Sequence, residues 1–331
     1  MLVFVTSVVH PDNCYSYEKI WQLLNNTLYS VCSQQDQDFR VIVICGKQMP
    51  LFHHAELINR HTEFIVVDFP GDLEAAANNF KRLGNLSLPP DDVYWFRNPA
   101  NADCETKTGV RSLVIQVLRR KIGVRSLARQ VLRGTEDPEE VHSKERRIAL
   151  SLFRVDKGSK LLIGILAAKK YTPEYMLIFD ADDYVGNDIS AYVNTHPGEN
   201  GWIMASVYKM EGDMVAPIYA PYTVCGTGNI FSFSLLMEDI SPKVSEKSTQ
   251  NELFEHVDSE FLMFILGTHR QARLYYEQKG RPLQEYPYRS AVYLVGHGEN
   301  HSERIPRPRG WEKSRGMVPV SPELKRYFNI V

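Results

Sequence analysis

The sequence lacks the long apolar runs and the amino-terminal features that mark membrane and secreted proteins. No run approaches the ~18 apolar residues that a membrane-spanning helix requires. The chain opens with Met1-Leu-Val-Phe-Val-Thr6, an apolar stretch that is too short for a signal peptide and lacks its charged beginning. We therefore expect a cytoplasmic protein.

Cysteine is also scarce, and the net charge is small. The five cysteines are odd in number and form no Cys-x-x-Cys pair, so they give no disulfide framework and favour a reducing compartment. They are Cys14, Cys32, Cys45, Cys104 and Cys225. A net charge of −2 gives no overall reason to expect a nucleic-acid partner.

The first seventy residues alternate between strand-like and helix-like segments. Leu2–Val9, Phe39–Cys45 and Phe64–Val67 have the composition of buried strands, and Ser16–Gln34 has apolar residues at helical spacing. This alternation predicts a wound, mostly parallel sheet flanked by helices, beginning with an αβ half at residues 1–70. At 331 residues, the chain is long enough to bury one large core or two smaller ones.

Three carboxylates directly follow another predicted central strand. The apolar segment Tyr175–Phe179 leads into Asp180, Asp182 and Asp183. Open α/β sheets bind ligands at the carboxyl ends of their strands, and residues two apart project to the same side. Asp180 and Asp182 would therefore share Mg²⁺ or Mn²⁺, which favour oxygen ligands and borrow others from a phosphate. The alternative is a solvated acidic turn.

Other polar residues follow the predicted strands at the same edge of the sheet. Thr6 lies in the later part of the first strand and Asp68 follows the third, so both would lie on the same edge as Asp180. Lys157 and Lys160 would begin a helix that Asp156 caps and that leads into the Tyr175 strand. The two lysines would contact a nucleotide or its phosphates, or would be ordinary solvated lysines.

Residues 71–150 interrupt the αβ pattern and are predicted to be a helical insertion. Two basic segments, 109–119 and 123–133, repeat the pattern Gly-Val-Arg-Ser-Leu with a period of 14 residues, which keeps nearly the same helical face. One hypothesis is an amphipathic helix pair that rests on anionic lipid. The alternatives are a helical excursion packed on the domain and a contact between two copies in a homodimer.

The remaining part, 151–331, would hold the catalytic and acceptor-binding half. A further strand is predicted at Trp202–Tyr208, followed by a loop in which Gly226 and Gly228 allow a close backbone approach. That loop lacks the rest of a dinucleotide-binding or P-loop fingerprint, which excludes a Rossmann dehydrogenase and a P-loop NTPase.

Two further pairs in this half are candidate site residues. Asp258 and Glu260 are candidate bases near a helix start, with Asp258 as a helix cap being the alternative. His297 and His301 are candidate metal ligands in a Gly-rich loop, although a lone histidine is more often structural.

Taken together in this order, the motifs resemble a GT-A-fold, nucleotide-sugar-dependent glycosyltransferase of the family-two type. The resemblance covers most of the chain except roughly residues 71–150. The motifs that carry it are Phe4-Val-Thr-Ser-Val-Val-His-Pro, Lys157-Gly-x-Lys, the Asp180-Ala-Asp182 "DxD" motif, Gly226-Thr-Gly-Asn229, an acidic residue near a later helix start, and a carboxyl-terminal His. The family's usual Glu-Asp pair is replaced by Val257-Asp258-Ser259-Glu260, which leaves the base open.

The resemblance implies a single GT-A domain and a transferase of the hexosyltransferase type. Thr6 and Asp68 would contact the nucleoside, Asp180 would face the ribose or reach the metal through water, and Asp182 would ligate the metal. His297 or His301 would complete the coordination of Mn²⁺ or Mg²⁺. The donor would be a nucleotide-diphosphate sugar, with UDP favoured, and the acceptor a carbohydrate or other hydroxyl compound.

The mechanism that the resemblance implies depends on the base. Asp258, or Glu260 as second choice, would take the acceptor proton in an inverting single displacement. If neither acts, a retaining mechanism is the alternative. The competing classes are a nucleotidyltransferase, which makes a nucleotide sugar, and a non-catalytic module that binds sugar or a membrane surface.

Overall fold

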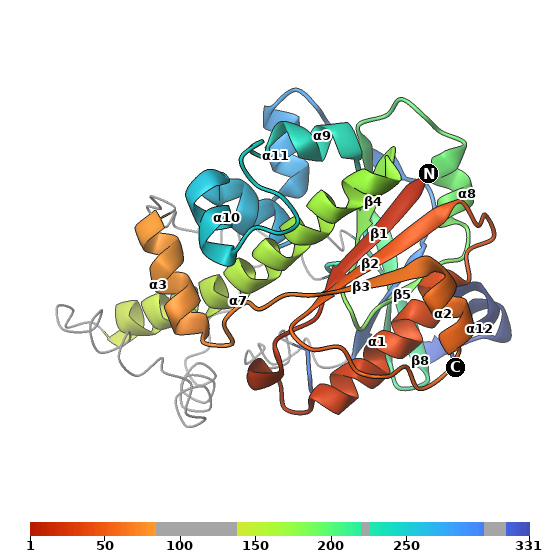
Figure 1. Ribbon diagram of the computed structural model, residues 1–331. Helices are drawn as coiled ribbons and strands as arrows, with labels where there is room; N and C mark the ends of the chain where they lie inside the picture. Colours follow the sequence, from red (N-terminus) through yellow and green to blue (C-terminus); the bar gives the residue numbers. More distant parts are fainter. Residues whose placement is uncertain (84–137, 220–224, 301–315) are drawn as a thin grey trace.

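The computed structural model describes residues 1–83, 138–219, 225–300 and 316–331 (Figure 1). Its centre is a seven-stranded sheet in the order β10-β6-β9-β4-β1-β2-β3. The strands are β1 (Leu2–Ser7), β2 (Phe39–Cys45), β3 (Thr62–Val66), β4 (Tyr175–Ile178), β6 (Gly201–Met204), β9 (Asn229–Ser232) and β10 (Gln284–Tyr286). Only β9 runs antiparallel to its neighbours, so the predicted wound, mostly parallel sheet is confirmed.

The central strands are buried on both faces because helices cover both sides of the sheet, as a parallel sheet requires. Val3 and Val5 of β1 pack toward α7, whereas Leu2 and Phe4 pack toward α1. Figure 1 shows α7 crossing one face of the sheet and α1 lying on the other. The α7 face carries α3 (Leu73–Leu83), α7 (Pro138–Ala168), α9 (Phe233–Glu238), α10 (Gln250–His256), the π-helix Phe261–Leu266 and α11 (Ala272–Gln278); the other face carries α1 (Tyr17–Cys32), α2 (Ala55–His61) and α8 (Ile189–Asn194).

A second, smaller sheet has the order β12-β8-β7-β11-β5. Its strands are β5 (Tyr184–Val185), β7 (Ser206–Glu211), β8 (Met214–Tyr219), β11 (Ala291–Val295) and β12 (Val318–Pro319). The last helix, α12 (Pro322–Phe328), packs on it through the fully buried Phe328. The single strand predicted at Trp202–Tyr208 is wrong, since a bend at Ala205 divides it between β6 and β7 in two different sheets.

The helix before β4 begins much earlier than the sequence suggested. It was expected to start at Asp156, but α7 is continuous from Pro138, because the preceding segment is rich in the helix formers Glu, Arg, Leu and Ala. Asp156 is therefore not a helix cap. The predicted domain boundary at residue 150 also falls inside this continuous helix. The basic repeat at 109–133 lies outside the described residues and stays a prediction.

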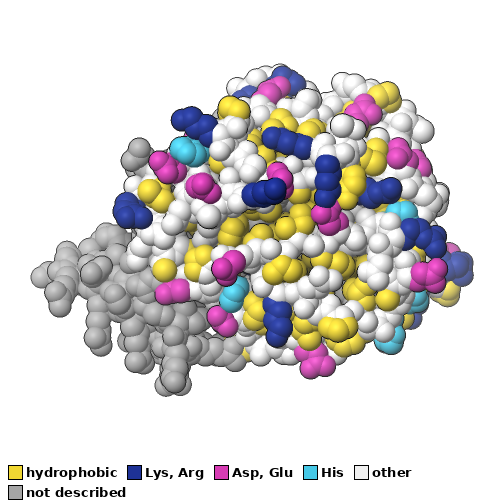
Figure 2. Space-filling view, in the orientation of Figure 1, with side chains coloured by type: hydrophobic (Ala, Val, Ile, Leu, Met, Phe, Trp, Pro, Cys, Tyr) yellow, Lys and Arg dark blue, Asp and Glu magenta, His cyan; other side chains and the backbone are white. Residues whose placement is uncertain are grey.

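The side chains on the face shown in Figure 2 are mixed in charge. Lys and Arg side chains lie among Asp and Glu side chains there, and no broad patch of one sign stands out. None of the helices in the described ranges combines the length and apolar character that crossing a membrane requires.

Candidate functional site

The acidic turn after β4 is held in place by the glycine loop before β9. The backbone N–H of Asp180 donates to Thr227 Oγ1 at 2.9 Å, and the Thr227 hydroxyl donates to Asp183 Oδ2 at 2.7 Å. A Cβ atom on Gly226 would lie 2.1 Å from Asp180 Oδ2, so a larger residue there would displace the Asp180 carboxylate from its present position. The two loops are thus locked together at the carboxyl end of β4.

Asp183 is a buried structural carboxylate at the centre of this arrangement. Its side chain also accepts the N–H of Leu294 at 3.1 Å, which connects the turn to β11 in the second sheet. Burial, together with the charges of Asp182 and Asp180, raises the pKa of Asp183 well above its ordinary value. Asp183 therefore positions the turn and is not exposed to a ligand.

Asp180 is paired with Lys157 from α7. The Lys157 ammonium contacts Asp180 Oδ1, and the two side chains are 28% and 26% exposed. Burial alone would raise the pKa of Asp180, but the Lys157 ammonium, together with His269 and a backbone hydrogen bond from Gly226, holds that pKa below its usual range. The predicted proximity of Lys157 to the acidic turn is present, and both groups remain accessible to a ligand.

Asp182 is paired with His297, which follows β11. His297 Nε2 lies 3.0 Å from Asp182 Oδ2, and His297 Nδ1 accepts the N–H of Glu299 at 3.2 Å. Because Nδ1 accepts a hydrogen bond, the proton of a neutral ring lies on Nε2, which donates to Asp182. The Glu299 carboxylate in turn accepts the N–H groups of Tyr15 and Ser16, which ties this loop to the start of α1.

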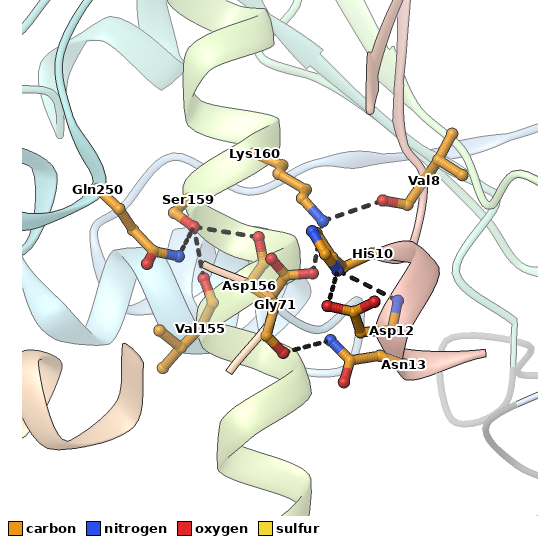
Figure 3. A network of polar contacts seen from close by, with 10 residues as sticks. All are labelled: Val8, His10, Asp12, Asn13, Gly71, Val155, Asp156, Ser159, Lys160 and Gln250. Atoms are coloured by element: carbon orange, nitrogen blue, oxygen red, sulfur yellow. Dashed lines mark hydrogen bonds and ion pairs between the residues drawn. The ribbon is translucent and has the colours of Figure 1, made fainter. Parts of the chain in front are cut away.

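Lys160, unlike Lys157, is buried. Its side chain is 1% exposed, and its ammonium donates to Asp156 Oδ2 at 2.7 Å and to the carbonyl of Val8 at 3.0 Å (Figure 3). Asp156 Oδ1 is buried and has no hydrogen-bond partner among the described residues. In this arrangement, the Lys160 ammonium is buried and bonded, and it fastens α7 to the end of β1.

The loop after β1 is packed closely around His10, as Figure 3 shows in part. A Cβ atom on Gly71 would lie 2.5 Å from His10 Nδ1, and one on Gly46 would lie 2.9 Å from His10 Cδ2. Asn13 donates from Nδ2 to the carbonyl of Gly71 at 3.0 Å. These contacts bring the segments after β1, β2 and β3 together at the carboxyl edge of the sheet.

Thr6 and Asp68 lie at that same edge, because β1, β3 and β4 all run in parallel. Thr6 is fully buried, and its Oγ1 has no hydrogen-bond partner among the residues that the structure describes. Asp68 is exposed. Their predicted contacts with a nucleoside stay predictions.

The two candidate bases lie before the π-helix Phe261–Leu266. Asp258 is exposed, and its Oδ1 accepts the N–H of Phe261 at 2.9 Å. This is the kind of contact that a helix cap makes, as the alternative interpretation of Asp258 predicted. Glu260 is also exposed. Neither hydrogen bond nor ion pair joins these two side chains to the Asp180 turn within the described ranges. His301 lies outside the described residues.

Sequence reasoning missed His269, whose ring lies in the electrostatic field of Asp180 and Lys157. Its Nε2 atom is buried without a hydrogen-bond partner among the described residues. Burial and the nearby Arg270 charge lower the pKa of His269 to about 3, so the ring is neutral near pH 7. No local pattern marks His269, since only the fold brings residue 269 near residue 180.

Two protein donors at this site are suited to a divalent cation. Within the described parts of the chain, no group of three or more His, Cys, Asp or Glu is arranged to hold a metal ion. The 3.0 Å between Asp182 Oδ2 and His297 Nε2 equals the separation of neighbouring octahedral ligands, which is about 3 Å for bonds of ~2.1 Å. His297 would first have to give up its Nε2 proton, and the Glu299 contact at Nδ1 would change.

Comparisons with known proteins give little beyond this. No family model and no curated protein matches the chain. A crystal structure of Staphylococcus aureus TarS residues 1–349 in complex with UDP is 12% identical, with a TM-score of 0.34 and coverage of 89% of this chain and 61% of that one. The same TarS fragment in a second structure is 9% identical, with a TM-score of 0.31 and coverage of 88% and 60%.

A third TarS structure is 10% identical, with a TM-score of 0.30 and coverage of 89% of this chain and 36% of that one. The chain therefore spans less than two thirds of the length of each TarS chain. At this level of likeness, function has to be argued from the site.

Proposed function

We propose that the protein is a glycosyltransferase of the GT-A type that moves a sugar from a nucleotide-diphosphate donor to an acceptor hydroxyl. The observation that carries the proposal is an acidic turn in which Asp180 pairs with Lys157 and lies against Gly226, while Asp182 pairs with His297. Donors suited to a divalent cation and an accessible ammonium are what a diphosphate requires. The group stands at the edge of a parallel sheet where such folds bind ligands.

Mn²⁺ or Mg²⁺ would be held by Asp182 and His297, with Asp180 nearby. The cation would neutralise the charge that develops on the diphosphate as the sugar–phosphate bond breaks. The chain's own residues contribute the rest. Lys157 offers a positive charge to a phosphate, and Thr227 and Gly226 keep Asp180 in position. We put UDP first among the nucleotides because it is the commonest donor nucleotide in the family that the sequence resembles.

Asp258 is our first choice for the base, with Glu260 second. The Phe261 N–H occupies Asp258 Oδ1, and its Oδ2 remains the atom that would take the acceptor proton. A working base here would give inversion, and a hexosyl group is the sugar we expect. A nucleotidyltransferase would need a glycine-rich basic loop after β1, and the segment Val8-Val9-His10-Pro11-Asp12 has no such loop.

The test is thermal unfolding of the wild-type protein and of Asp182→Asn with UDP, GDP, CDP or dTDP, each with and without Mn²⁺. A ligand that binds only the folded state stabilises it by about 2.7 kcal/mol at a hundredfold excess over its dissociation constant. We expect one nucleotide to raise the midpoint of the wild-type protein only when Mn²⁺ is present, and Asp182→Asn not to respond.

A wild-type protein that responds to no nucleotide, with or without Mn²⁺, would overturn the proposal. The module that binds sugar or a membrane surface would then be the hypothesis to test. If Asp182→Asn responds as the wild-type protein does, the nucleotide is still identified, but Asp182 is not a ligand of the metal.

A further inference from the structure

The ion pair between Lys157 and Asp180 occupies part of the site in which a divalent cation would bind. The Lys157 ammonium contacts Asp180 Oδ1 and also lies in the field of Asp182 and Asp183. It therefore supplies positive charge to a turn that carries three carboxyl groups. Like charges this close are costly without such compensation, so the turn has a counter-ion of its own.

The backbone on both sides of this ion pair is fixed. Next to Lys157, a Cβ atom on Gly158 would lie 2.1 Å from the carbonyl oxygen of Leu262, which shows how closely α7 packs on the π-helix. Asp180 is held by Thr227 and approached closely by Gly226. Any rearrangement of the ion pair must therefore occur in side chains, and Lys157 has the longer one, with a flexible four-carbon stem and a compact charge.

Lys160, one turn further along α7, shows what a fixed lysine looks like in this protein. Its side chain is 1% exposed. Its ammonium donates to both a carboxylate and a backbone carbonyl, as Figure 3 shows. Lys157 is 28% exposed, and its hydrogen-bond partner is Asp180. Of these two lysines, Lys157 alone can exchange its partner without uncovering a buried charge.

We propose that Lys157 is the counter-ion of Asp180 until a divalent cation binds, and then moves to the diphosphate of the donor. A cation near Asp180 and Asp182 would repel the ammonium, and a diphosphate would offer it a new partner. The exchange makes the site's affinity for metal alone low and couples metal binding to donor binding. This inference rests on the proposed function for its second half only, because competition with the metal requires no nucleotide.

The first experiment measures Mn²⁺ alone, by calorimetry and by the electron paramagnetic resonance signal of free Mn²⁺. Lys157→Met should bind Mn²⁺ about tenfold more tightly than the wild-type protein, since the cation no longer displaces an ammonium. Lys170→Met is the matched control, because it removes an ion pair with Glu63 (2.6 Å) without touching the site. The control should bind Mn²⁺ as the wild-type protein does.

The second experiment adds UDP, GDP, CDP or dTDP at saturating Mn²⁺. Lys157→Met should bind the nucleotide that the wild-type protein selects about tenfold more weakly, since the phosphate loses its ammonium partner. Opposite changes in the two affinities support the exchange. A lysine that only contacts phosphate would lower the nucleotide affinity and leave the Mn²⁺ affinity unchanged, which overturns the proposal.

The remaining outcomes also decide the question. Unchanged nucleotide affinity in Lys157→Met overturns the move to the diphosphate. If no nucleotide binds the wild-type protein, the proposed function fails, but tighter Mn²⁺ binding by Lys157→Met still supports the competition. Should Lys157→Met not fold, lysine side-chain NMR of the wild-type protein replaces it, with the Lys157 signal assigned from Lys157→Arg. Mg²⁺ alone should shift that signal, and an unshifted signal overturns the proposal.

Discussion

At the scale of single residues, two carboxylates of this protein have two roles each. Asp180 lies where a ligand would bind and also neutralises Lys157. Asp258 caps the π-helix through Phe261 and is our candidate base. A substitution that removes a carboxylate at such a position changes both roles at once, so the roles have to be separated by choosing the replacement.

Asparagine separates the two roles of Asp258, because Asn and Asp cap helices about equally well. We expect Asp258→Asn to keep the stability and the nucleotide affinity of the wild-type protein, whereas sugar transfer slows by about 10²-fold or more. Asp258→Ala should in addition lose about 1 kcal/mol of stability, because Ala cannot cap. Transfer rates, nucleotide titrations and urea unfolding of the two variants give these three quantities.

Glu260→Gln is the control for Asp258→Asn, since Glu260 is an equally exposed carboxylate two residues away. It should transfer sugar at the wild-type rate. If Glu260→Gln slows transfer and Asp258→Asn does not, Glu260 is the base. If neither substitution slows transfer, single displacement with either base is excluded and a retaining mechanism becomes the hypothesis.

At the scale of elements, α7 connects the core to the site. Its apolar stripe, which includes Leu161, Leu162 and Ile165, packs on the sheet, and Lys157 at the carboxyl edge reaches the acidic turn. Two glycines allow α7 to pack so closely. Gly158 faces the backbone of the π-helix, and Gly164 faces the side chains of Ile44 and Val5.

These two glycines should respond differently to alanine. At Gly158, the added Cβ would meet a backbone oxygen at 2.1 Å, whereas at Gly164 it would meet the far ends of Ile44 and Val5 at 2.5 Å. Alanine gains ~1 kcal/mol of helix propensity over glycine, and overpacking costs about 1–3 kcal/mol. We expect Gly158→Ala to be destabilised by a few kcal/mol and Gly164→Ala by less, as measured by urea unfolding. Equal losses of stability in the two variants would show that the backbone of the π-helix shifts to accommodate a Cβ atom as readily as the Ile44 and Val5 side chains do.

At the scale of the whole molecule, the site depends on contacts between both sheets. The acidic turn follows β4 of the large sheet, while His297 follows β11 of the small sheet. Asp183 joins them through Thr227 and Leu294, and Glu299 adds the start of α1. Unfolding of either sheet would therefore dismantle the site.

The stability of the whole molecule should also depend on pH through the buried His61. This ring stacks on Phe39 with centroids 4.3 Å apart, and burial, followed by the charges of Arg40 and Arg60, lowers the pKa of His61. The folded-state pKa is then below the unfolded value of about 6.5, so acid protonates the unfolded chain first. The contribution of neutral His61 is complete above the unfolded pKa of about 6.5 and is lost as pH falls from there through the lower folded-state pKa.

We expect His61→Phe to lose less stability than the wild-type protein between about pH 7.5 and about pH 5, as measured by urea midpoints. Phenylalanine keeps the stacking on Phe39 and does not titrate. His53→Gln, at an exposed position, is the control and should follow the wild-type pH profile. An unchanged pH profile for His61→Phe would mean that the His61 ring can reach solvent in the folded state.

How much could be predicted from the sequence differs between the strands and the site. The strand at Phe39–Cys45 and the helix that follows Ser16 were predicted nearly to the residue, because their apolar spacing and cap are local properties. The start of α7 was not, because Asp is a residue type typical of helix caps, and only the continuous helix from Pro138 shows that Asp156 lies inside it.

The sequence by itself determined the wound α/β architecture and the acidic turn after a buried strand, since apolar periodicity and residue type are local properties of the chain. The tertiary structure decided which charges meet. It separated Lys157, which contacts Asp180, from Lys160, which is buried against Asp156. It also brought Thr227 and His297 to the turn from distant segments. The physical reason is that the energy of a charge depends on its neighbours and its burial, and both are set only when the chain packs.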